Sequence, residues 1–122
     1  MAWFVAHAIF LIEPKNGKGQ DLTVWENSYL VEAGDFDEAK LKAEKHGAEV
    51  EKANDDLKVG DTKAGYTFLG IRKVIARSGS AQEESDDLID TEEISYSEYR
   101  VSSKEDALAL VKGGEVSVVY VD

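Results

Sequence analysis

The chain has 122 residues, and with 25 acidic against 14 basic side chains it carries a net charge of -11. Nucleic acids and anionic membranes are bound through clustered lysines and arginines, so this composition argues against both as partners and favours a basic protein instead. The absence of cysteine excludes disulfide frameworks, cysteine-bound zinc and thiol nucleophiles, and it is consistent with a reducing cytoplasm, where we expect the protein to act.

Two strands joined by a short turn come first. Residues 2–12 are apolar on both faces, which predicts a central strand covered on both sides, or one covered by a helix and a partner subunit. The run is too short to span a bilayer and lacks the basic start of a secretory signal. Residues 14–20 contain glycines that predict a turn. Residues 22–32 then alternate apolar with polar side chains, which predicts a second strand with Glu26 and Ser28 on a solvent-exposed face.

A capped helix and a third strand follow. Asp35 at the N-cap, with Glu38 three residues later, predicts a helix from Asp35 to about Ala53. Apolar residues spaced three and four apart predict that one stripe of this helix is buried. Residues 54–65 contain two glycines and predict a loop, and the apolar residues of 66–76 predict a strand.

The last third of the chain begins with an acidic segment. Residues 78–99 contain eight acids and no lysine or arginine, and we expect 78–92 to form a mobile, solvated loop. Residues 93–101 alternate as a strand does, Ser103 is expected to cap a short helix, and residues 116–121 predict a last strand.

Hairpin connections dominate this order of strand, strand, helix, strand, strand, helix, strand. We therefore expect a single α+β domain over residues 1–122. Its core should be a mostly antiparallel sheet of about five strands, with one long helix packed on one face and a short second helix.

The pattern resembles that of the bacterial domain-of-unknown-function 4288 family. Four segments carry the resemblance: WFVAHAIFLIE at 3–13, WENSYLVEAGDFDEAKLKAE at 25–44, YTFLGIRKV at 66–74 and EISYSEYRV at 93–101. It covers the chain from Trp3 to about Val101, and the remaining residues look like an added helix and strand. The resemblance implies an α+β fold. It implies no catalytic residue, because the family has no established activity.

The two histidines of the chain are the first candidates for chemistry. His7 lies in the middle of an apolar strand, where a neutral imidazole bonded to a backbone or carboxylate partner is expected. His46 falls on the apolar stripe of the helix and could lie over the first strand, so that the two rings would share a polar pocket. No spacing typical of a metalloenzyme or a serine hydrolase is present. We expect no metal, no cofactor and no catalytic residue.

Aromatic residues beside acids on the predicted strands are the candidates for binding. Aromatic rings and charges combine in this way at protein interfaces, although any one ring could instead fill the core. The candidate ligand- or partner-binding residues are Trp25, Tyr29, Glu93, Tyr96, Glu98 and Tyr99.

Two functional hypotheses follow from these features. The first is a non-enzymatic interaction module that binds a basic protein, such as a toxin that it neutralises. The alternative is a small-molecule binding protein or minor enzyme with a pocket between sheet and helix near His7 and His46. Homodimerisation through the first strand or a sheet edge is compatible with both.

Overall fold

The structure is a computed structural model that describes residues 2–14, 22–59, 62–77 and 88–121. Most of the predicted turn, at 15–20, and the greater part of the acidic segment, at 78–87, lie outside the described residues. The described elements are β1 (Ala2–Pro14), β2 (Leu22–Ala33), α1 (Phe36–Ala53), β3 (Lys58–Val59), β4 (Thr62–Ala76), β5 (Glu93–Val101), α2 (Lys104–Val111) and β6 (Val119–Tyr120).

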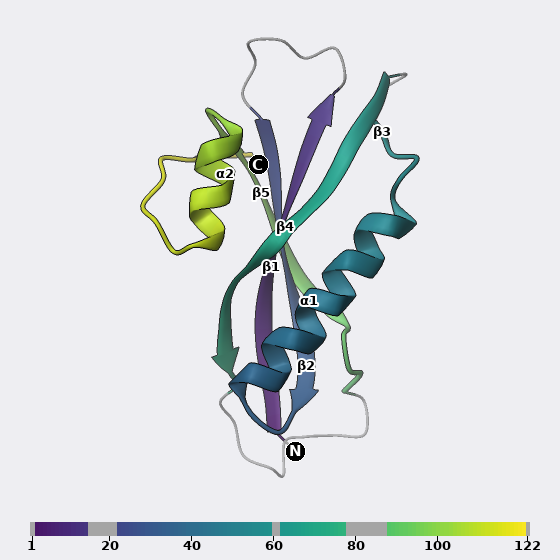
Figure 1. Ribbon diagram of the computed structural model, residues 1–122, viewed down its shortest axis with the longest axis vertical. Helices are drawn as coiled ribbons and strands as arrows, with labels where there is room; N and C mark the ends of the chain where they lie inside the picture. The colour runs from purple at the N-terminus through teal and green to yellow at the C-terminus, as the bar shows by residue number, and fades with distance from the viewer. Residues whose placement is uncertain (1, 15–21, 60–61, 78–87, 122) are drawn as a thin grey trace.

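The six strands form one sheet in the order β3-β4-β1-β2-β5-β6, and every neighbouring pair is antiparallel. α1 runs obliquely across one face of this twisted sheet, over β4, β1 and β2 (Figure 1). α2 packs against the other face. The expected antiparallel α+β fold is confirmed. In the described part of the chain, no helix is long and apolar enough to cross a membrane.

Two predicted boundaries are wrong. Residues 54–65, predicted as a loop, contain β3 and the start of β4, because strands that pair over two residues are too short to show a hydrophobic period. The predicted strand at 116–121 is paired as a strand only over Val119–Tyr120. Val116 and Val118 pack instead against the core beneath α2, so their alternation reflects burial and not strand pairing.

β1 is buried on both faces, as predicted, and it separates two cores. Phe4 and Phe10 point into the core under α1, whereas Ile9 points into the core under α2. The prediction of a solvent-exposed face on β2 is wrong, since Ser28 is 5% exposed and the side chain of Glu26 is 12% exposed. α2 and the residues after it help to cover that face, which the alternation of β2 alone cannot reveal.

α1 begins as predicted, because the Asp35 side chain accepts a hydrogen bond of 2.8 Å from the backbone N–H of Glu38. The predicted buried stripe is confirmed at Ala39 and Ala43 but not at its first residue, Phe36, which is 52% exposed. The helix buries small residues spaced four apart, namely Ala39, Ala43 and Gly47. These small residues let the helix backbone approach the sheet closely.

Gly47 marks the closest approach, and replacing it tests the packing of α1. A Cβ atom at this position would lie 2.5 Å from the ring of Phe68, which itself packs against Phe10. Alanine is favoured over glycine in a helix by about 1 kcal/mol, but overpacking a core costs about 1 to 3 kcal/mol. We expect Gly47→Ala to lower the free energy of unfolding by up to about 2 kcal/mol, measured by urea denaturation.

The exposed neighbouring position provides the control for this substitution. Ala48→Gly should cost about 1 kcal/mol through helix propensity alone. A Gly47→Ala protein that was more stable than the parent would contradict the close contact between α1 and β4.

The end of the acidic segment is anchored to the sheet. The backbone N–H of Thr91 donates to the carbonyl of Leu30 at 2.7 Å, and the N–H of Leu30 donates to the carbonyl of Glu92 at 2.9 Å. Asp90 accepts hydrogen bonds from the backbone of Glu32 and from Lys42. Burial raises the pKa of Asp90, but these bonds outweigh it and hold the pKa below its usual value. Residues 88–92 are therefore held in place, contrary to the predicted mobile loop.

Candidate functional site

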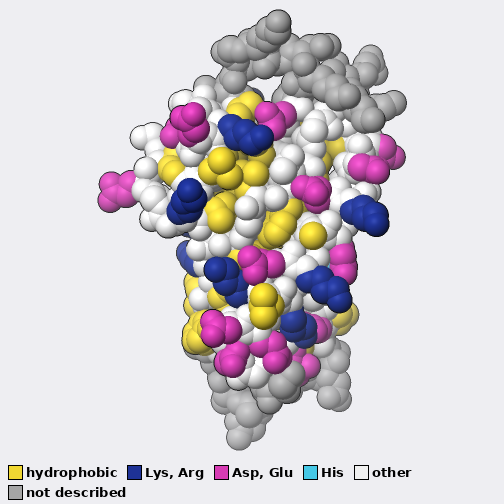
Figure 2. Space-filling view, in the orientation of Figure 1, with side chains coloured by type: hydrophobic (Ala, Val, Ile, Leu, Met, Phe, Trp, Pro, Cys, Tyr) yellow, Lys and Arg dark blue, Asp and Glu magenta, His cyan; other side chains and the backbone are white. Residues whose placement is uncertain are grey.

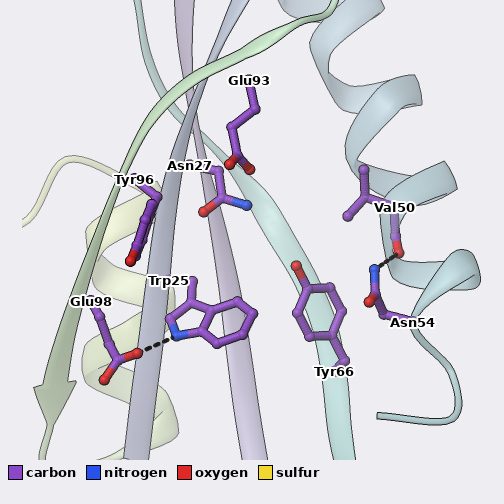
Figure 3. A pocket seen from close by; sticks show the side chains of 8 residues that line it. All are labelled: Trp25, Asn27, Val50, Asn54, Tyr66, Glu93, Tyr96 and Glu98. Atoms are coloured by element: carbon purple, nitrogen blue, oxygen red, sulfur yellow. Dashed lines mark hydrogen bonds between the residues drawn. The ribbon is translucent and has the colours of Figure 1, made fainter.

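A cavity of about 380 Å³ lies on the α1 face of the sheet, beside the C-terminal end of α1. We call it the Trp25 pocket. Its lining comes from β2, β4, β5 and the end of α1, and Figure 3 shows these side chains arranged around one hollow. The lining residues are Trp25, Asn27, Val50, Asn54, Tyr66, Glu93, Tyr96 and Glu98.

The position of α1 explains why this part of the sheet is hollow. The helix lies over β4, β1 and β2, so the same side of β5 carries no helix above it. Trp25 and Tyr96 stand on one side of the hollow, and Tyr66 stands across from them (Figure 3).

Two of the three aromatic rings that line the pocket, Trp25 and Tyr66, are held in fixed orientations. The indole Nε1–H of Trp25 donates a hydrogen bond of 2.8 Å to Glu98, which keeps that carboxylate beside the ring. The ring of Tyr66 meets the indole edge-on at 5.9 Å between centroids and stacks on Phe10 at 5.1 Å. Each of these contacts limits the rotation of a ring, so these two rings are held in place before a ligand binds.

Oxygen atoms without hydrogen-bond partners in the described part of the chain face this pocket. Asn27 is 6% exposed, and its amide nitrogen donates to the Tyr29 hydroxyl at 3.2 Å, whereas its Oδ1 has no partner among the described residues. The Glu93 carboxylate points toward Asn27 and, within the same residues, is also unpartnered (Figure 3). Glu93 is exposed, and no fully buried side-chain nitrogen or oxygen of the described residues lacks a partner, so both oxygens are open to solvent. A donor from outside the chain can therefore take the place of water at these two oxygens.

The Tyr66 hydroxyl completes the polar end of the pocket. Burial raises the pKa of Tyr66, and the neighbouring Tyr29 and Glu93 raise it further, so the hydroxyl stays protonated at neutral pH. It points toward the end of the pocket where Asn27 and Glu93 lie (Figure 3). The pocket therefore has an aromatic wall, made of Trp25 and Tyr96 with Tyr66 across from them, and a group of oxygens from Asn27, Glu93 and Tyr66 at one end.

Four of the six predicted binding residues meet in this pocket. They are Trp25, Glu93, Tyr96 and Glu98. Tyr29 is buried behind the lining, where its hydroxyl accepts the hydrogen bond from Asn27. Tyr99 lies on the opposite face of the sheet and is also buried, so these two rings belong to the cores.

Tyr99 belongs to a group of polar side chains that joins four strands on the α2 face. Glu26 of β2 accepts hydrogen bonds from Tyr99 of β5 at 2.9 Å and from Arg72 of β4 at 3.0 Å. It also lies 3.0 Å from Nδ1 of His7 on β1. Burial raises the pKa of Glu26, but the hydrogen bonds from His7 and Tyr99 and the charge of Arg72 outweigh it and lower the pKa to about 2.

The geometry around His7 does not match that of a serine hydrolase. Both the Glu26 carboxylate and the Ser28 hydroxyl, at 3.2 Å, lie against Nδ1 of His7, whereas a triad uses the two ring nitrogens for these two partners. An ionised carboxylate can only accept, so Nδ1 carries the proton. The carboxylate partner expected for His7 is present.

The two histidines do not meet, and this expectation is wrong. His7 points to the α2 face, whereas the ring of His46 packs edge-on against Tyr29 on the α1 face, at 4.6 Å between centroids. Successive residues of a strand point to opposite faces, and His7 has the parity of Ile9. The expected pocket between sheet and helix exists, but neither histidine lines it.

Four lining residues were not among the predicted binding residues. They are Asn27, Val50, Asn54 and Tyr66. The parity of β2 could have added Asn27, which lies two residues from Trp25 and so points to the same face. Nothing in the sequence shows that β4 and the end of α1 reach this pocket, because that depends on the order of strands in the sheet. Among the described residues, no group of His, Asp or Glu is arranged to hold a metal ion.

Comparison with known proteins gives a family and no function. The model of a domain of unknown function, DUF4288, matches residues 3–97. No curated protein and no solved structure matches the chain. The matched region contains the first four strands, α1 and most of the Trp25 pocket, and it ends one residue before Glu98.

Proposed function

The chain belongs to the DUF4288 family, and because this family has no defined activity we propose a function from the geometry of the Trp25 pocket. We propose that the protein is a non-enzymatic binding module for a basic protein partner, and that the pocket takes a lysine or arginine side chain of that partner. The observation that carries the proposal is the aromatic wall of Trp25, Tyr66 and Tyr96 combined with the carboxylates of Glu93 and Glu98.

A cationic group matches both the aromatic wall and the group of oxygens. A cation over an aromatic face gains about 0.5 to 2 kcal/mol, depending on how far it is desolvated. Its N–H groups would donate to the Glu93 carboxylate and to Asn27 Oδ1, which accept no hydrogen bond within the described residues. Hydrogen bonds between charged groups are roughly twice as strong as neutral ones.

The end of α1 adds a further preference for positive charge. The C-terminal end of a helix carries a partial negative charge from its last carbonyl groups. Val50 lies in the last turn of α1 and Asn54 is its C-cap, and both line the pocket. The helix therefore contributes to a negative potential at this site.

Charge alone does not mark a site on the α1 face. Figure 2 shows Asp and Glu side chains interspersed with Lys and Arg on this side of the molecule. The net charge of -11 supports electrostatic attraction of a basic partner as a whole, whereas the pocket supplies the specific contact. Association should therefore slow as salt is raised.

Replacing Glu93 tests the role of the carboxylates. As a probe we choose a short blocked peptide in which lysine alternates with threonine, called the lysine peptide. Glu93→Gln should weaken its binding about fivefold in calorimetry, because a charged acceptor becomes a neutral one.

The control for this substitution removes the same charge elsewhere. Glu105 is exposed in the first turn of α2, which packs against the other face of the sheet. Glu105→Gln should leave binding of the lysine peptide nearly unchanged. If both substitutions weakened binding equally, the pocket would not be the binding site, and net charge alone would explain the binding.

A second candidate function uses the same pocket. Its volume of about 380 Å³ lies within the range of small-molecule sites, about 300 to 1,000 Å³. A small organic cation would meet the same rings and oxygens as a lysine side chain. This candidate predicts that a free amine such as blocked lysine binds as tightly as the lysine peptide.

The wider biological setting stays a prediction. Neutralisation of a basic toxin in the cytoplasm is one form that such binding could take, and its support is the acidic composition and the absence of cysteine. Homodimerisation through a sheet edge is addressed by the experiment on β5 below.

A further inference from the structure

β5 forms most of an open sheet edge beside the Trp25 pocket. β6 pairs with β5 only at Tyr99 and Arg100, and the next contact is the backbone N–H of Val121, which donates to the carbonyl of Glu98 at 3.0 Å. Before Glu98, no strand in the described part of the chain pairs with the outer edge of β5. Within the described residues, the outer edge of β5 at Tyr96 is therefore free to pair with another chain.

The alternation of the strand fixes which groups face this edge. The carbonyl of Glu98 points outward, because it accepts the hydrogen bond from Val121. Residues two apart point the same way, so the N–H and C=O of Tyr96 also face outward. The inner edge of β5 is paired with β2, where Tyr96 lies opposite Asn27. An added strand would meet Tyr96 without disturbing the sheet.

The side chains around this edge favour an extended segment. Tyr96 is 66% exposed and Ile94 is 48% exposed, which is unusual for large side chains in a strand. A second cavity, of about 540 Å³, lies along the edge where β6 ends, and it shares Tyr96 and Glu98 with the Trp25 pocket. The two cavities therefore lie next to each other at Tyr96 and Glu98.

We propose that the basic partner binds as an extended strand added to the edge of β5 in line with β6, with a lysine or arginine opposite Tyr96. This rests on the proposed function of the pocket. A residue that pairs with Tyr96 places its side chain on the same face of the sheet, where the Trp25 pocket lies. The backbone hydrogen bonds of the added strand would then supply affinity, and its cationic side chain would supply specificity.

Charge decides between a basic segment and a second copy of the chain. Glu93 and Glu98 flank Tyr96, and residues 78–99 contain eight acids and no lysine or arginine. Two β5 edges that paired with each other would bring the carboxylates of Glu93 and Glu98 close to those of the second copy, and each chain carries a charge of -11. A basic strand would instead reduce the repulsion between the carboxylates and the net negative charge.

Backbone methylation of the lysine peptide tests strand addition. A lysine opposite Tyr96 directs its own N–H toward β5, whereas the N–H groups of the threonines on either side point to solvent. N-methylation of the lysines should weaken binding at least about tenfold, because the hydrogen bonds to β5 are lost. N-methylation of the threonines should leave binding nearly unchanged. Binding is measured by calorimetry and by the NMR signal of the Trp25 indole N–H.

A pair of variants tests the same contact from the protein side. Tyr96→Ala removes the ring but keeps the outward N–H, whereas Tyr96→Pro removes both. The proline variant should bind the lysine peptide about tenfold more weakly than the alanine variant. Circular dichroism should show that both variants are folded.

The possible results separate this inference from the proposed function. If both methylated peptides bind as well as the parent and shift the Trp25 signal, strand addition is wrong and the pocket proposal stands. If the lysine peptide itself neither binds nor shifts that signal, both are wrong. A dimer in sedimentation that Tyr96→Pro dissociates would assign the edge to a second copy and overturn the proposal of a basic strand.

Discussion

Glu26→Gln is expected to make the protein less stable at neutral pH and to remove part of its sensitivity to acid. The folded protein lowers the pKa of Glu26 from 4.5 to about 2. A lowered pKa stabilises the fold above the unfolded pKa, and this contribution is lost as the pH falls from about 4.5 to about 2. The shift corresponds to about 3 kcal/mol at neutral pH.

The difference between the two proteins should therefore depend on pH. Urea denaturation at a series of pH values between 7 and 2 measures the free energy of unfolding of the parent and of Glu26→Gln. The parent should be more stable by about 3 kcal/mol at pH 7, and the difference should shrink as the pH falls through the range from about 4.5 to about 2. Glu105→Gln serves as the exposed control. A difference that stayed constant with pH would contradict the ionised state of Glu26.

Glu26 is also the chain neighbour of two residues that line the pocket on the other face. Glu26 ties β2 to β1, β4 and β5 through His7, Arg72 and Tyr99. Its neighbours in the chain, Trp25 and Asn27, point to the opposite face and line the Trp25 pocket. Loss of Glu26 should therefore disturb the pocket only as far as β2 shifts.

Trp25→Ala should cause the largest loss of binding without unfolding the protein. The substitution removes the aromatic wall and releases Glu98 from the hydrogen bond that holds it at 2.8 Å. Loss of a cation–π contact together with a fixed charge is worth about 2 kcal/mol, which corresponds to roughly 30-fold weaker binding of the lysine peptide. Calorimetry measures the affinity, and thermal denaturation by circular dichroism checks that the variant remains folded.

Trp25→Phe separates the ring from its hydrogen bond. The phenyl ring keeps an aromatic face but cannot donate to Glu98. We expect it to bind the lysine peptide more tightly than Trp25→Ala and more weakly than the parent. Affinities that were equal in the parent and in Trp25→Ala would show that the peptide does not use this pocket.

Much of the fold could be predicted because it depends on local patterns. Asp35 and Ser103 both accept the predicted capping hydrogen bonds, and the alternation in 22–32 and 93–101 places the strands correctly. Local patterns fail where a distant segment decides the outcome. The sequence pattern predicts that Glu26 is a solvent-exposed residue of a strand. Only the packing of α2 and the residues after it against the sheet shows that this face is covered.

The candidate site could be predicted in part for the same reason. Trp25 and Tyr96 were identified because aromatic side chains beside acids are typical of binding surfaces. The parity of β5 separates Tyr96 from Tyr99, but it does not show which of the two faces is open. That depends on α1 lying over β4, β1 and β2 and not over β5, and this placement is a property of the whole sheet.

The indole N–H signals in an NMR titration test the central claim most directly. The chain has two tryptophans, and Trp3 lies on β1 near its start, away from the pocket lining, so it serves as an internal control. The lysine peptide should shift the Trp25 signal and leave the Trp3 signal in place, whereas a peptide with norleucine for lysine should shift neither. Binding of the lysine peptide without a change at Trp25, or an equal shift with norleucine, would contradict a cation site in this pocket.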